Sequence, residues 1–225
     1  MSVLFTRRGE PPLIGKMLSD YAEGDIVYLN ENGNPVAFYV VKHNYESDLN
    51  SPGRTLLVRK DCYGSIQWNS AGNNEYAGST IDNWLNGTYK SLLDASVQEA
   101  MGSTIFEYFS YSAAKVTTLF RSVFLLSCTE LGFNGATAPH AITGEGEALP
   151  ISATLLIAYY NGSAVVWSTR SAGTTTSTTA VNYVDSSGRN GGGSCTDSRY
   201  ARPVLTLPGA SLFDEKTNTF KKGVA

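Results

Sequence analysis

Residues 201–207 read Ala-Arg-Pro-Val-Leu-Thr-Leu, an apolar run that predicts the strand closing the fold. A shorter motif, Trp-Ser-Thr-Arg-Ser, precedes it at residues 167–171. Each motif places an arginine among strand residues, where the five donors of a guanidinium can satisfy backbone carbonyls. We therefore expect Arg170 and Arg202 to be structural rather than ligand-binding.

Strand patterns continue upstream of these two motifs. Residues 26–29 and 36–41 flank an Asn-Gly-Asn turn at 32–34, which predicts a β-hairpin. Residues 155–160 and 164–167 flank the Asn161-Gly162 turn in the same way. Further strands are predicted at residues 55–59 and across the continuous apolar run 122–127.

Helical signals are confined to the region between these strands. Ser79 or Thr80 can cap a first short helix, which Asn86-Gly87 is predicted to end. Asp94 can cap a second short helix over residues 95–101. The chain therefore predicts an α+β fold with two short helices, antiparallel strands and long loops.

Residues 174–200 form a tract biased toward Thr, Ser, Gly, Asn and Asp. Such a tract can be a floppy surface loop, because it offers little apolar area to offset its ordering. It can also be a binding surface on a rigid scaffold, as in paratopes built from Tyr, Ser, Gly and Asn. The alternating residues 180–184 and the closing strand hold both ends, which favours the binding surface.

The expected binding residues project into solvent from one contiguous face, while Val181 or Val184 and Val204 point into the core below. Arg199 and Tyr200 are the expected hot spots, since Arg and aromatic side chains dominate interfaces. The predicted ligand-binding residues are Thr175, Asp185, Arg189, Asn190, Asp197, Arg199 and Tyr200.

Length and charge narrow the class of protein. The chain has 225 residues, which favours one elaborated domain, and a net charge of -3 with scattered Lys and Arg, which argues against nucleic acid. No apolar run approaches the roughly 18 residues of a membrane span, and the N-terminus lacks the order of a signal peptide. We expect synthesis in the cytoplasm, with an extended arm at 1–22, the domain at 23–208 and a polar tail at 209–225.

The sequence contains few patterns that indicate a catalytic site. His43 and His140 have no recognised nucleophile context, and Glu145 and Glu147 lie in a loop that would hold acid-base geometry poorly. The cysteines are too widely spaced for a disulfide framework or a zinc cluster, so free structural thiols are expected at Cys62, Cys128 and Cys195. The chain is therefore predicted to be no enzyme, and to need neither cofactor nor metal.

The three tryptophans are expected to be structural. Trp84 lies within the first predicted helix and Trp167 within a strand motif, and both are expected to bury their rings. Trp68 has polar neighbours, so partial exposure as a loop anchor is predicted there.

Five motifs in order resemble an uncharacterised domain family common in Gram-positive gut bacteria and their prophages. They are residues 24–27, 80–86, 123–127, 167–171 and 201–205. The closing part of that family is similar to the C-type-lectin-like domains of phage tropism proteins and of proteins diversified by retroelements. The resemblance implies a lectin-like α+β fold, no catalysis, and ligand contact just before the last strand.

The resemblance has limits. The family's usual Trp-Leu-Arg-Ser has one residue more between Trp167 and Arg170 here, and the calcium and sugar motifs of animal C-type lectins are absent. Paired catalytic cysteines of lectin-like enzymes also have no counterpart. Calcium-dependent sugar binding and an enzymatic activity are therefore not implied.

The sequence leads to a non-catalytic binding module, encoded by a phage or prophage, that contacts a host cell-surface protein or glycan through residues 174–200. The N-terminal arm would contact other virion proteins. The sequence leaves the oligomeric state of the chain open. The alternatives are a structural virion or surface protein without a specific ligand, and a degenerate enzyme of the lectin-like superfamily.

Overall fold

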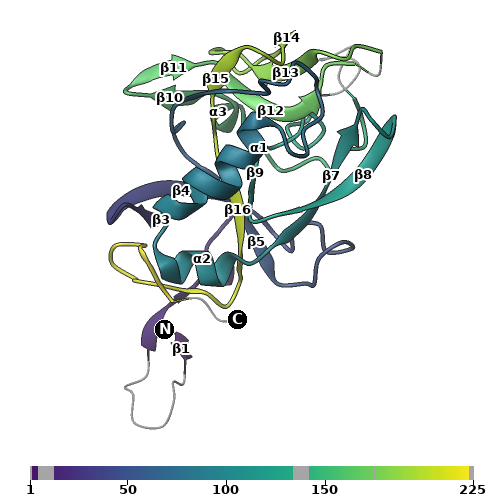
Figure 1. Ribbon diagram of the computed structural model, residues 1–225. Helices are drawn as coiled ribbons and strands as arrows, with labels where there is room; N and C mark the ends of the chain where they lie inside the picture. Colours follow the sequence, from purple (N-terminus) through teal and green to yellow (C-terminus); the bar gives the residue numbers. More distant parts are fainter. Residues whose placement is uncertain (1, 5–12, 134–141, 175, 223–225) are drawn as a thin grey trace.

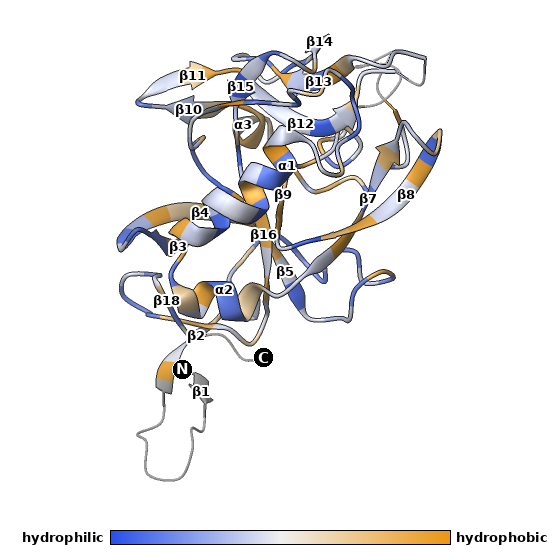
Figure 2. Cartoon of the chain, in the orientation of Figure 1, coloured by the Kyte–Doolittle hydropathy of each residue, from blue (hydrophilic) through white to orange (hydrophobic). Residues whose placement is uncertain are grey.

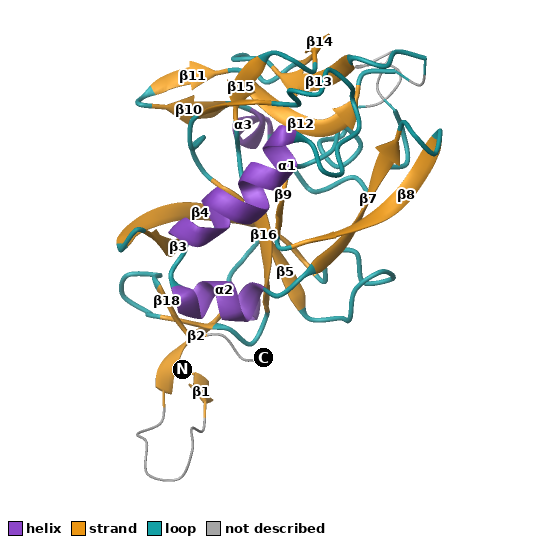
Figure 3. Cartoon of the chain, viewed as in Figure 1, coloured by secondary structure: helices purple, strands orange, loops and turns teal. Residues whose placement is uncertain are grey.

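The computed structural model describes residues 2–4, 13–133, 142–174 and 176–222. These residues form a mixed α+β structure of mostly antiparallel strands with two short helices, as the sequence predicts, and with one further single-turn helix (Figure 3). Strands β10 to β15 gather at one end of the molecule, and β1 lies at the other (Figure 1). None of the helices in the described ranges has the length and apolar character needed to cross a bilayer.

The central sheet has five antiparallel strands in the order β3-β4-β5-β16-β9. The predicted 26–41 hairpin is confirmed, because Asn32 and Gly33 both have positive φ, as a two-residue hairpin turn requires. The predicted closing strand lies between two neighbours rather than at an edge. The strands are β3 Ile26–Glu31, β4 Asn34–His43, β5 Arg54–Arg59, β16 Val204–Pro208 and β9 Val123–Phe124.

A second five-stranded sheet has the order β14-β13-β12-β15-β6. All its pairs are antiparallel except β12 with β15. Its central strand β12 is buried throughout although it is polar, as the hydrophilic band within it shows (Figure 2). The strands are β14 Asn190–Ser194, β13 Ala180–Val184, β12 Trp167–Ala172, β15 Ser198–Tyr200 and β6 Ser65–Gln67.

The helices begin where the sequence predicts, but the first does not end there. The Ser79 hydroxyl accepts a hydrogen bond from the Asp82 amide at 3.2 Å, which caps α1 Thr80–Trp84. The expected stop at Asn86-Gly87 is wrong, because the chain continues as a wide turn over Leu85–Tyr89 and a 3₁₀ turn over Lys90–Leu92. The Asn86 side chain explains this, since it bonds Val123 and Ser122 of the strand below instead of turning the helix.

The second helix, α2 Ala95–Met101, starts after Asp94 and ends at Gly102 with φ 54°, as predicted. The Asp94 side chain makes no capping hydrogen bond, because its carboxylate accepts from the Asn30 amide at 2.8 Å instead. The third, α3 Ala153–Leu156, takes up residues that the sequence analysis had placed in a strand. Two hairpins complete the set, β7 Thr104–Ser110 with β8 Lys115–Arg121, and β10 Ala158–Tyr160 with β11 Ser163–Val165. The first of these hairpins was not predicted.

The two ends of the chain pair with each other, which an extended arm and a polar tail would not do. A four-stranded sheet has the order β1-β2-β17-β18, and Leu212 and Phe213 of the expected tail are fully buried. Leu18, in the 3₁₀ turn Leu18–Asp20, is also fully buried. The strands are β1 Ser2–Leu4, β2 Leu13–Met17, β17 Leu212–Phe213 and β18 Phe220–Lys222.

Two buried arginines donate hydrogen bonds to backbone carbonyls, which confirms the expectation that both are structural. Arg202 donates to the carbonyls of Arg59, Lys60 and Leu155. Arg170 donates to the carbonyls of Leu125, Glu107 and Glu145. Each guanidinium thus joins separate segments of the chain through their backbone carbonyls.

The tryptophans differ from expectation in one case out of three. Trp167 is fully buried, as predicted. Trp68 is fully buried too, although partial exposure was expected, because its indole N–H donates to the Thr169 carbonyl of β12. Trp84 packs against Tyr63 and Tyr89 at the border of the core, which agrees with the expectation of a largely buried ring, although it is less completely enclosed than Trp68 and Trp167.

Candidate functional site

Three strands, at residues 180–184, 190–194 and 198–200, form within the polar tract. β13 and β14 form a hairpin closed by residues 185–189, and β15 follows. The Asp185 carboxylate accepts from the amides of Ser187 and Arg189 at 2.8 and 2.9 Å, which holds the turn. Asp185 is therefore occupied within the turn, whereas Arg189 is exposed.

Strand β14 consists of Asn-Gly-Gly-Gly-Ser, a composition of low strand propensity, and it lies at the edge of its sheet. A Cβ at Gly191 would clash with the Tyr183 ring, and one at Gly193 would clash with the Arg199 guanidinium. Both glycines are thus needed where a neighbour approaches the backbone closely. A Cβ at Gly192 would instead meet only the Val181 carbonyl oxygen, at 4.0 Å.

A hollow of about 400 Å³ opens on the Gly192 side of the hairpin. It has neutral polar side chains and bare backbone at its surface, and its lining residues are Gly173, Thr174, Thr179, Ala180, Asn182, Asn190, Gly192, Gly193 and Ser194. The amide nitrogen of Asn190 lies 3.4 Å from both Asn182 Oδ1 and Cys128 Sγ, and Asn182 donates to the Ala172 carbonyl at 2.7 Å. These contacts orient both amides from below.

The wall of this hollow is held by a residue far away in the sequence. Asn74 is fully buried, its backbone N–H donates to the Thr178 carbonyl, and its amide donates to those of Ser177 and Ala180. The segment before β13 is thereby tied to the body of the protein. Sequence reasoning missed Asn74, because an isolated Asn in a loop carries no signal of its distant partner.

The predicted hot spot Arg199 is not free to bind a ligand. It is 9% exposed, pairs with Asp197 at 2.6 Å, donates to the Ser194 carbonyl at 3.2 Å and lies 4.6 Å from the centre of the Tyr183 ring. The expectation that it projects into solvent is wrong. It serves instead to lock β14 and β15 together.

The predicted site residues do not share one contiguous face. Asn190 lines the hollow beside Gly192, whereas Asp197 and Arg199 line a second hollow of about 590 Å³ with Tyr183 and Val166. Tyr200 is half-buried and packs on Tyr160 with ring centres 4.8 Å apart. Thr175 lies outside the described residues. The core side is as predicted, with Val181, Val184 and Val204 fully buried.

A buried polar cluster lies beneath the second sheet, where a loop had been expected around Glu145. Glu145 and Glu130 are fully buried, and Arg170 pairs with Glu130 at 2.5 Å. Glu145 accepts from the Phe109 amide at 2.8 Å and from the Ser171 hydroxyl. The loop is therefore held rigidly, by groups that are enclosed in the protein and not presented to a substrate.

Burial raises the pKa of the Glu145 carboxyl above 4.5, and the Arg170 guanidinium offsets only part of this. The folded chain thus holds this proton more tightly than the unfolded chain, so the stabilising contribution is full below pH 4.5 and is lost as pH rises through the raised pKa. We expect the wild type to lose stability relative to Glu145→Gln between pH 4.5 and 7. Urea unfolding across this range checks it, with the exposed Glu215→Gln as control. Parallel pH curves for wild type and Glu145→Gln would contradict it.

The remaining candidate nucleophiles of the described residues are buried or hydrogen-bonded within the protein. All three cysteines are free and buried, and burial raises the pKa of the Cys62 and Cys128 thiols to about 12. The His43 ring nitrogens contact the Thr55 hydroxyl and the Tyr21 carbonyl, both at 2.9 Å, and His140 lies outside the described residues. In the described part of the chain, no group of three or more His, Cys, Asp or Glu is placed to hold a metal ion.

Comparison with known proteins gives one match. A search of curated proteins and a search of solved structures returned no match. The family model described as "Domain of unknown function (DUF6273)" matches residues 52–209, from just before β5 to just after β16, which is more than half of the chain. The protein therefore belongs to the DUF6273 family.

Proposed function

We propose that this chain is a non-catalytic binding module with a lectin-like fold, which recognises a glycan of a host cell surface through the hollow beside Gly192. The observation that carries the proposal is this hollow, formed by an edge strand of three glycines and walled by a segment that Asn74 ties down. A specific binding site benefits from polar side chains that are already held in place. The conformational entropy of these side chains is then lost when the protein folds and not when it binds its ligand.

The chemistry of the lining supports a neutral ligand. No charged side chain is among the residues that line this hollow. Amide and hydroxyl groups such as those of Asn190, Thr179 and Ser194 can both donate to and accept from sugar hydroxyls. The bare backbone at Gly192 adds a surface against which a flat ring can lie. The resemblance of the closing motifs to those of phage tropism proteins favours a cell surface as the place of this glycan.

Gly192 and Gly191 give a matched test. Gly192→Val should place an apolar side chain in the hollow, since the only atom near its Cβ is one backbone oxygen at 4.0 Å, and should abolish adsorption of the labelled chain to Gram-positive gut bacteria. Gly191→Ala should instead lower stability by roughly 1–3 kcal/mol, since its methyl group would meet the Tyr183 ring. Thermal unfolding and cell adsorption measure the two effects.

The probes are whole cells of a panel of strains and the polysaccharide purified from any strain that adsorbs the wild type. Adsorption that this polysaccharide inhibits, and that Gly192→Val loses with an unchanged melting temperature, supports the proposal. A wild type that adsorbs to no strain favours a structural covering role instead. Adsorption by Gly192→Val equal to that of the wild type refutes the site.

A further inference from the structure

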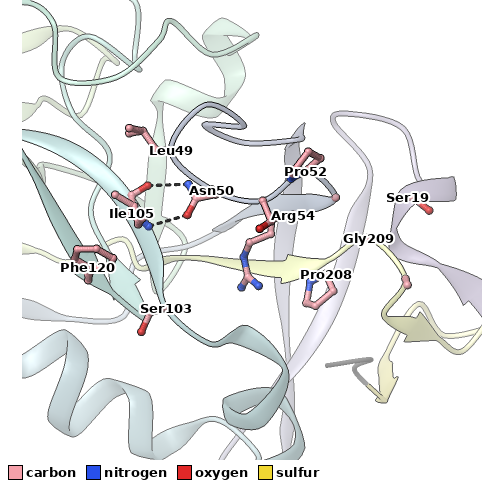
Figure 4. Close-up of a pocket in the computed structure, with 13 residues that line it drawn as sticks. Ser19, Leu49, Asn50, Pro52, Arg54, Ser103, Ile105, Phe120, Pro208 and Gly209 are labelled. Carbon is pink, nitrogen blue, oxygen red and sulfur yellow. Dashed lines mark hydrogen bonds between the residues drawn. The ribbon is translucent and has the colours of Figure 1, made fainter.

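A further pocket lies away from the glycine strand. It measures about 840 Å³, within the range of roughly 300–1,000 Å³ typical of small-molecule sites. It lies where the loop before β5 meets the base of the β7–β8 hairpin and the segment after β16 (Figure 4). Its lining residues are Ser19, Leu49, Asn50, Ser51, Pro52, Gly53, Arg54, Ser103, Ile105, Phe120, Pro208, Gly209 and Ala210.

Arg54 supplies a positive charge to this pocket. Its Nε donates to the Thr206 hydroxyl at 2.7 Å, and its Nη2 donates to the carbonyls of Thr206 and Met101. All three partners are neutral. Among the described residues no carboxylate lies within ion-pair distance of this guanidinium, and its Nη1 has no hydrogen-bond partner.

Burial accordingly lowers the pKa of Arg54, since desolvation disfavours its charge and no anion offsets it. Arg59 and Arg170 are instead paired, with Glu31 and Glu130. Arg202 also lacks a carboxylate partner and has a pKa lowered by burial, but its Nε, Nη1 and Nη2 all donate to backbone carbonyls.

Arg54 differs from Arg202 because it lines a pocket and its Nη1 makes no hydrogen bond to the described residues. A half-buried guanidinium without a counter-ion in a pocket of this size favours an anionic occupant. A carboxylate suits it, because the N–H groups of Nη1 are left to donate a charge-assisted hydrogen bond to a carboxylate oxygen.

The rest of the pocket is built for an apolar group. Phe120 is 59% exposed, one of the few large apolar side chains of the described residues that point into solvent. Leu49, Ile105 and Pro52 continue the apolar surface (Figure 4). Asn50 adds no free polar group, because its amide bonds both the N–H and the carbonyl of Ile105, at 2.9 Å each. That pair of bonds fixes the loop against β7 and keeps the pocket open.

We propose that this pocket binds a carboxylate joined to an apolar group, with Arg54 taking the carboxylate and Phe120 the apolar part. A peptide C-terminus with an apolar last residue and a free aliphatic or aromatic acid share this chemistry. The site is separate from the hollow beside Gly192, so it does not rest on the proposed glycan function.

Isothermal titration calorimetry with N-acetylphenylalanine tests the proposal. The matched probe N-acetylphenylalaninamide, which lacks the charge, should bind at least about tenfold more weakly, a difference of about 1.4 kcal/mol. Decanoate and an N-acetylated tripeptide ending in Phe, with a free or an amidated C-terminus, then separate a free acid from a peptide end as the source.

Three variants complete the design. Arg54→Gln should weaken binding of N-acetylphenylalanine about tenfold, and Phe120→Ser, at an exposed position, should weaken it several-fold with an unchanged melting temperature. Lys115→Gln, which removes an exposed positive charge at the other end of β8, should leave binding within about twofold of the wild type. If Arg54→Gln does not fold, the comparison of the acid with its amide and the binding of Phe120→Ser still test the proposal.

The proposal is overturned if the acid and its amide bind equally, if no acid probe binds, or if Phe120→Ser and folded Arg54→Gln both bind like the wild type. Tighter binding of decanoate than of the free-acid tripeptide supports the proposal with a lipid-like acid as ligand. Tighter binding of the tripeptide supports it with a protein end.

Discussion

Replacing Arg170 with Met is expected to lower the free energy of unfolding by about 3–5 kcal/mol, the cost of leaving the partner of a buried ion pair alone. Arg170 is fully buried, bonds three backbone carbonyls and pairs with Glu130. Methionine fills part of the volume but provides none of these donors. Chemical denaturation followed by Trp fluorescence measures the loss.

Glu130 makes this prediction specific. Tyr45 and the Ser127 amide also donate to the Glu130 carboxylate, so Arg170→Met leaves an enclosed negative charge that these neutral donors only partly satisfy. Adding Glu130→Gln to Arg170→Met should therefore recover part of the lost stability, because it removes that charge. A loss below about 1 kcal/mol for Arg170→Met, as for an exposed ion pair, would contradict the prediction.

Trp68→Ala is the second large effect, and should cost about 3–5 kcal/mol. The ring is fully buried, its centre lies 6.1 Å from that of Tyr76, and its N–H donates to the Thr169 carbonyl at 2.9 Å. Alanine leaves both a cavity and a buried carbonyl without its donor. The melting temperature and the urea midpoint should both fall.

Trp84→Ala is the matched comparison. Its ring is less completely enclosed, so the loss should be smaller, roughly 1–2 kcal/mol from the apolar area involved. Compared with Trp68→Ala, Trp68→Phe should recover much of the packing but not the hydrogen bond to the Thr169 carbonyl. Equal losses at positions 68 and 84, or a larger one at position 84, would contradict this ranking.

Local signals were sufficient for several elements of the fold. The 26–41 hairpin follows from residues that adopt positive φ at its turn, and α1 and α2 begin after the residues predicted to cap them. The strand at 180–184 follows from alternation within a polar tract. Each of these depends on contacts between residues only a few positions apart, which is why the sequence alone predicts them.

The composition of the polar tract predicts displayed polar groups but not how the tract packs. Its composition indicated a display of Ser, Thr, Gly and Asn, but not that Gly191 and Gly193 accommodate Tyr183 and Arg199. Arg199 was chosen as a hot spot because arginine is common in interfaces, yet its partners Asp197 and Tyr183 use it inside the protein. Residue type alone cannot separate a displayed arginine from one that packs.

By itself, the sequence determined an α+β chain with its main hairpin, its helix starts and its buried arginines, because propensity, capping and donor number act locally. Only the tertiary structure decided that Trp68 is buried on Thr169, 101 residues away, and that the two chain ends share one sheet. It likewise decided that Arg54 lines a pocket without a counter-ion, since Thr206, its hydrogen-bond partner, is 152 residues distant. Burial and charge compensation are properties of neighbours in space, and a linear sequence does not state which neighbours these are.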